Sequence, residues 1–86
     1  MSIAKQLKIQ KKKTKDYIEG LIKECIKQGK FTTDFAANVG SDTDLYIECI
    51  DEISKSIRRT GYHLEIHEIK VTGQYSKIIV DVVKNK

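Results

Sequence analysis

The stretch SDTDLYIECIDEISKSIRRTG, residues 41–61, decides the fold that we expect for this chain. Leu45, Cys49, Ile53 and Ile57 recur at every fourth position, so they share one stripe of a helix. Charged side chains fill the opposite face. A helix with one apolar face needs a sheet or a second helix to cover it, and the rest of the chain is expected to supply that cover.

The ends of this stretch carry helix-boundary signals. Ser41 or Asp42 is expected to cap the first amides of the helix. Gly61 is expected to end the helix in the left-handed conformation, which costs glycine little.

Length and composition indicate one small domain spanning residues 1–86. A domain of this size buries a modest share of its surface, so self-association would help to stabilise it. We find no apolar run long enough to cross a membrane and no apolar centre of a secretion signal. Cys25 and Cys49 both fall on apolar helix stripes, and we interpret them as reduced core residues of an intracellular protein rather than a disulfide or reactive pair.

The positive charge is concentrated at the start of the chain. Residues 1–15 hold six lysines and no acid, which gives +6; the whole chain has a net charge of +4, so the remaining residues carry −2. A cationic segment on a nearly neutral body favours a polyanionic partner. The alternative is a solvated lysine-rich terminus that only aids solubility.

The first residues allow two interpretations. Residues 6–10, QLKIQ, alternate between apolar and polar side chains, which indicates a short strand followed by a lysine loop and a helix that starts at Thr14 or Asp16. Alternatively, one long helix runs from the start of the chain and includes Ile3, Leu7, Thr14, Ile18 and Leu21. We favour the strand, because the long helix would have a wide polar gap in its apolar stripe.

Later residues give clearer signals. The period changes to two at Phe31, so residues 31–39 form a strand with one buried face. Two more strands follow Gly61, with a bulge near His67 and a short hairpin turn at residues 72–74. In the last strand, Ile78, Val80 and Val82 point inward.

These signals give the order β-α-β-α-β-β. We expect an α/β (α+β) two-layer sandwich: a four-stranded mixed sheet with parallel neighbours, and two helices on one face. The carboxyl ends of the parallel strands would then bring the lysine loop, the turn at residues 38–41 and the hairpin tip to one edge, beside both helix amino ends. Such an edge binds ligands in open α/β sheets, and helix amino ends attract phosphate.

Two segments resemble a known family. Residues 9–18, IQKKKTKDYI, are similar to the first loop and helix start of the Alba chromatin and RNA-binding proteins, and residues 64–71, LEIHEIKV, are similar to their third strand. The resemblance implies an Alba-like fold and maps the lysine pair of that family onto Lys11 and Lys12. The C-terminal domain of translation initiation factor three has the same expected element order and a hairpin similar to residues 70–74.

Catalytic and metal chemistry find little support. His63 and His67 lie about 13 Å apart on an extended strand, too far to share one zinc ion. We see no nucleophile with a paired base, no phosphate-binding glycine loop and no cysteine cluster, so we expect no enzyme activity, cofactor, metal or small-molecule substrate.

We therefore predict a low-specificity protein that binds the phosphate backbone of RNA or DNA as a homodimer, or as a heterodimer with a related chain. Its expected location is the cytoplasm, with the nucleoid or nucleus as variants. The alternative is a protein-interaction module that uses the acidic turn at residues 41–44 or the exposed pair Ile79 and Val83. That pair is the expected dimer contact. The predicted nucleic-acid contacts are Lys11, Lys12, Lys13, Lys15, Asn38, Ser41, Gln74 and Lys77.

Overall fold

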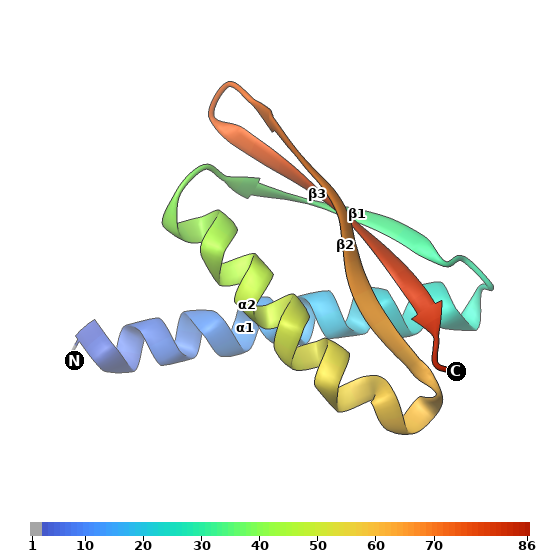
Figure 1. Cartoon of the computed structure of the whole chain (residues 1–86). Helices are drawn as coiled ribbons and strands as arrows, with labels where there is room; N and C mark the ends of the chain where they lie inside the picture. The colour runs from blue at the N-terminus through green and yellow to red at the C-terminus, as the bar shows by residue number, and fades with distance from the viewer. Residues whose placement is uncertain (1–2) are drawn as a thin grey trace.

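The chain begins with one long helix. The computed structural model describes the backbone of residues 3–86 and the side chains of residues 9–86, and α1 (Ile3–Lys27) is its first element (Figure 1). The strand predicted over residues 6–10 and the helix start at Thr14 or Asp16 are therefore wrong, and the long-helix alternative is right. Before Gly20 the helix contains no glycine, proline or asparagine, so nothing ends it, and lysine, glutamine and leucine favour helix. The alternation of five residues was too short to outweigh this propensity.

The remaining elements follow in the order strand, helix, strand, strand. They are β1 (Thr32–Asn38), α2 (Ser41–Ser56) with a short 3₁₀ turn η1 (Ile57–Thr60), β2 (Tyr62–Thr72) and β3 (Tyr75–Lys84). The central helix is confirmed, although α2 itself ends at Ser56. The 3₁₀ turn that continues it ends at Gly61, which adopts φ 93°, in the left-handed conformation that was predicted. In place of β-α-β-α-β-β, the chain follows α-β-α-β-β.

The sheet has three strands in the order β1-β3-β2, and every neighbouring pair is antiparallel. The predicted four-stranded mixed sheet is therefore wrong. β1 and β2 are joined through α2, as a parallel crossover would be, but β3 lies between them and pairs with both. The fold is α+β, with the sheet in one layer and both helices in the other (Figure 1).

Local details of the strands agree with the sequence. The register between β2 and β3 shifts between Ile66 and Glu68, which confirms the predicted bulge at His67. Thr72 pairs with Tyr75 across the hairpin. Gly73 has φ 61° and Gln74 has no positive φ, as in a type II′ turn.

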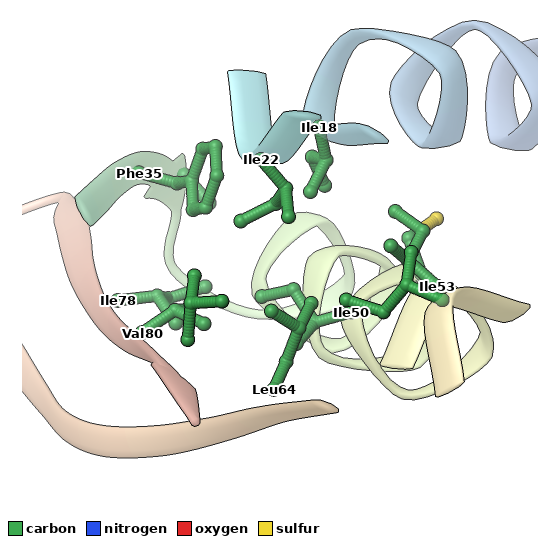
Figure 2. Packing of buried hydrophobic residues seen from close by; sticks show 12 residues of the cluster. Ile18, Ile22, Phe35, Ile50, Ile53, Leu64, Ile78 and Val80 are labelled. Atoms are coloured by element: carbon green, nitrogen blue, oxygen red, sulfur yellow. The ribbon is translucent and has the colours of Figure 1, made fainter. Parts of the chain in front are cut away.

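The core lies between the sheet and the two helices. Ile18 and Ile22 enter it from α1, Ile50 and Ile53 from α2, and Ile78 from the central strand (Figure 2). The other buried side chains of the cluster are Phe35, Ala37, Cys49, Ile57, Leu64, Val80 and Val82. On α1, Ile18 and Ile22 are buried, whereas the adjacent residues Tyr17 and Leu21 are exposed.

The start of α2 differs from the prediction in its cap. Gly40 is the N-cap residue, and no side chain caps the first amides. The carboxylate of Asp42 instead accepts a hydrogen bond from the Asn38 N–H (2.8 Å), and the Thr43 hydroxyl donates to the Asn38 carbonyl (2.7 Å). These bonds tie the first turn of α2 back to the end of β1.

Gly40 is expected to be the glycine least tolerant of substitution. Its φ of 99° and ψ of −132° lie in a region that side-chain-bearing residues avoid, so Gly40→Ala should lower the free energy of unfolding by about 1 to 3 kcal/mol. Gly20 is the matched control, because it lies inside α1 with open space where a Cβ would stand. Gly20→Ala should raise stability by about 1 kcal/mol. Urea titrations of both variants measure the difference, and equal effects would contradict it.

Candidate nucleic-acid interface

The predicted lysine cluster lies on a helix rather than in a loop. Lys11, Lys12, Lys13 and Lys15 all belong to α1, and α1 crosses α2 near the middle of both helices (Figure 1). The predicted cradle at the ends of parallel strands is therefore absent. It required a loop after a first strand, and the described residues 3–27 form a helix in place of both.

Lys11 is held by α2. Its ammonium group contacts the carboxylates of Glu48 (2.8 Å) and Glu52 (3.1 Å). The hydrogen bond with Glu48, followed by that with Glu52, raises the pKa of Lys11. Lys11 thus joins the two helices and has no free charge to offer a phosphate.

Lys12, Lys13 and Lys15 form no ion pair among the side chains that the structure describes. Lys12 and Lys13 are exposed, and Lys15 is half-buried. Helical spacing brings sequence positions 5, 8, 12 and 15, all lysines, to one face of α1. The side chains at positions 5 and 8 lie outside those described.

Lys15 also belongs to a second group of basic residues that the sequence did not reveal. It lines a shallow hollow with Lys55, Arg59, Ser56 and Glu52. From the sequence alone, Arg59 is predicted only to be a cation that interacts favourably with the carboxyl end of a helix. The hollow lies between Lys15 of α1 and the last turns of α2 and η1, so no spacing within one segment could indicate it.

The turns predicted at the sheet edge are close to each other but not to the exposed lysines. The Val39 N–H donates to the Gln74 carbonyl (3.0 Å), which joins the Asn38 turn to the hairpin tip. Ser41 lines a different hollow with Gln10 and Lys11. Asp42, Asp44 and Glu48 line the same hollow, so its charge is mainly negative and does not suit a phosphate.

The open face of the sheet carries polar contacts between its strands. Lys77 contacts Asp34 (3.1 Å), and His67 contacts Asp81 (3.3 Å). The predicted dimer contacts Ile79 and Val83 are half-buried among these groups. Lys77 is thus partly neutralised, in contrast to the exposed lysines of α1.

The histidines are engaged in pairwise contacts. His63 contacts the Asn85 side chain (2.6 Å), and His67 contacts Asp81. In the part of the chain that the structure describes, no three histidine, cysteine or acidic side chains are grouped as metal ligands would be. No helix among residues 3–86 combines the length and apolar character that crossing a bilayer requires.

Comparisons with known proteins give no match to this chain, whether with family models, with curated sequences or with solved structures. The element order expected from the Alba-like resemblance is wrong, because the described chain starts with a helix and the sheet lacks the first strand.

Proposed function

We propose that the protein binds the phosphate backbone of RNA or DNA with low sequence specificity, through the lysine face of α1. The observation that carries the proposal is the position of three lysines of α1 that have no carboxylate partner among the described side chains. Lys12 and Lys15 lie in line with the lysine positions 5 and 8, and Lys13 is exposed on the adjoining side of the helix. The rest of the chain carries a net negative charge, so the cationic surface is local.

Phosphate contacts of this kind give affinity rather than sequence readout. Lysine offers a flexible point charge, and each phosphate neutralised releases counterions, which makes binding steeply dependent on salt. Base recognition would need side chains that reach base edges or stack on bases, and α1 offers only Tyr17 as an exposed aromatic on the described surface. The proposal includes a binding rather than a catalytic role. It also includes a cytoplasmic location, or one on the nucleoid or in the nucleus, where reduced cysteines and nucleic acid occur together.

The double variant Lys12→Gln/Lys13→Gln is expected to weaken binding to a mixed-sequence duplex by a similar factor for every sequence. The slope of log affinity against log salt should become shallower by about 0.9 for each phosphate that the variant no longer neutralises. Filter binding or fluorescence anisotropy at several salt concentrations measures both quantities. The same measurement with a single-stranded RNA of the same length tests whether the protein also binds single strands.

The matched control is Lys84→Gln/Lys86→Gln, which removes the same charge from the exposed end of the chain. If binding depended on net charge alone, both double variants would lose the same affinity. Equal losses, or negligible binding by the unmodified protein at low salt, would contradict the proposal.

The alternative, a protein-interaction module, stays a proposal for the same chain. The acidic turn at residues 41–44 supports it, because Asp42 and Asp44 line a hollow with the apolar side chain of Leu45. An acidic rim around an apolar floor suits a basic peptide with an apolar anchor. If nucleic acid bound the unmodified protein and the Lys12→Gln/Lys13→Gln variant equally well, the result would support neither the lysine face of α1 nor the acidic hollow as the binding surface.

A further inference from the structure

Strand β2 has one edge without a strand partner. It pairs with β3 on one side only. On the other side, the hydroxyl of Ser54 from α2 accepts a hydrogen bond from the Leu64 N–H (2.8 Å) and donates to the Leu64 carbonyl (3.3 Å). The helix thus covers the edge at Leu64. Beyond that point, among the described residues, no hydrogen bond reaches the outer edge of residues 66–72.

The hairpin geometry fixes which backbone groups face outward. Residues that flank a two-residue turn form a hydrogen-bonded pair, and such pairs alternate along an antiparallel ladder. Thr72, Lys70 and Glu68 therefore bond to β3, opposite Tyr75, Lys77 and Ile79. Ile69 and Val71 present their N–H and C=O groups to the free edge.

The side chains on this half of β2 are also unusual. Ile66, Ile69 and Val71 point to the helix side of the sheet, yet they are 37%, 40% and 65% exposed. The hairpin continues beyond the cover that α2 provides (Figure 1). A free edge with an adjacent apolar strip is an arrangement that native proteins usually protect or use for pairing.

The free span 66–72 is complementary to itself. If two copies align antiparallel with Ile69 opposite Ile69, Glu68 of each copy lies opposite Lys70 of the other on the open face. The bulge at His67 is skipped, as it is in the pairing with β3, so Ile66 lies opposite Val71 of the second copy. Each exposed apolar side chain of the strip then meets another, and both charge pairs are favourable.

We propose that the protein forms a two-fold symmetric dimer by antiparallel pairing of the β2 edge, centred on Ile69. The partner is a second copy, because the segment Glu68, Ile69, Lys70 is complementary in charge to the same segment running in the opposite direction. In the single chain these charges make only a long contact of 3.9 Å along the same strand. The interface differs from the Ile79 and Val83 contact expected from the sequence, where a partner would have to cover the Lys77–Asp34 ion pair and the contact between His67 and Asp81 on the open face.

Charge reversal tests the register. Glu68→Lys places two lysines opposite each other at both symmetric positions, and Lys70→Glu places two glutamates there. Each single variant should weaken the dimer about tenfold to a hundredfold. The double variant Glu68→Lys/Lys70→Glu should dimerise like the unmodified protein. A mixture of the two single variants should form a heterodimer, although neither associates well alone. Sedimentation equilibrium over a range of concentrations measures all five samples, the unmodified protein included, without nucleic acid.

Two controls keep the test specific. Lys55→Glu changes the charge as Lys70→Glu does, but at an exposed position of α2, and should leave dimerisation unchanged. Ile79→Lys tests the rival open-face contact. The side chains of Glu68 and Lys70 are exposed, so circular dichroism should show that each variant remains folded. Four outcomes would each overturn the proposal. The unmodified protein could be monomeric, the single variants could dimerise normally, their mixture could stay monomeric, or the dimer could be lost only through Ile79→Lys. Because nucleic-acid binding is measured separately, either proposal can fail while the other stands.

Discussion

Replacement of Ile22 by alanine is expected to lower the free energy of unfolding by about 2 to 5 kcal/mol. Ile22 has no exposed surface and packs from α1 against the other helix and the sheet (Figure 2). The truncation removes buried methyl and methylene groups and leaves a cavity that close-packed neighbours fill only in part. A small domain has a stability of about 5 to 15 kcal/mol at most, so the loss is a large share of the total. Urea unfolding monitored by circular dichroism measures it.

Leu21→Ala provides the matched control for Ile22→Ala. Leu21 is the adjacent residue on the same helix, but it is 36% exposed. Its truncation removes less buried area and opens no enclosed cavity, so the expected loss is below about 1.5 kcal/mol. Similar losses for the two variants would mean that α1 packs against the domain through a different face.

The second large effect concerns the two free cysteines. Cys25 is half-buried, whereas Cys49 has no exposed surface and its thiol lies 3.8 Å from the Lys11 carbonyl, to which it donates. Burial, followed by the charge of Glu52, raises the pKa of Cys49 and so disfavours the reactive thiolate. If Cys49 reacts only when the domain opens, a maleimide or disulfide reagent should modify it on the order of 10³-fold more slowly than Cys25.

Single-cysteine variants separate the two rates. Cys25→Ser leaves only Cys49, and Cys49→Ala leaves only Cys25. In concentrated urea both should react at similar rates, and in native buffer only the Cys49 thiol should be protected. Rates within a few-fold of each other in native buffer would show that the interface between α1 and α2 opens readily.

The raised pKa of Cys49 also predicts how the stability of the folded state changes with pH. The folded state favours the neutral thiol, so the contribution of this group to stability is complete below the pKa of the unfolded chain. It is lost as the pH rises through the higher pKa of the folded state. The stability difference between the unmodified protein and Cys49→Ala should therefore narrow above about pH 9.

Elements with strong local signals were predicted well. The stripe of Cys49, Ile53 and Ile57, the terminal Gly61 and the bulge at His67 all follow from spacing and residue type within a few positions. The prediction for the start of the chain was wrong because a short alternation resembled a strand. On α1, Ile22 and Leu21 looked equivalent in sequence, and only the crossing of α2 decides which one is buried.

The candidate site was harder to predict because its geometry depends on distant partners. Lys11 looks like its neighbours Lys12 and Lys13 in the sequence. Its contact with Glu48 joins residues 37 positions apart, and no local pattern indicates it. Sheet order is equally non-local: placing β3 between β1 and β2 depends on which surfaces pack together, and the alternation within each strand is the same for either order.

The position of β3 also affects how the chain acquires its structure during synthesis. β1 and β2 make no ladder with each other, and each depends on residues 75–84 for its backbone partners. A nascent chain emerges amino end first, so both earlier strands must wait, unpaired, for the last strand to leave the ribosome. The sheet therefore cannot be completed before residues 75–84 emerge, whereas the hydrogen bonds inside each helix join residues that are close in sequence and need no later segment.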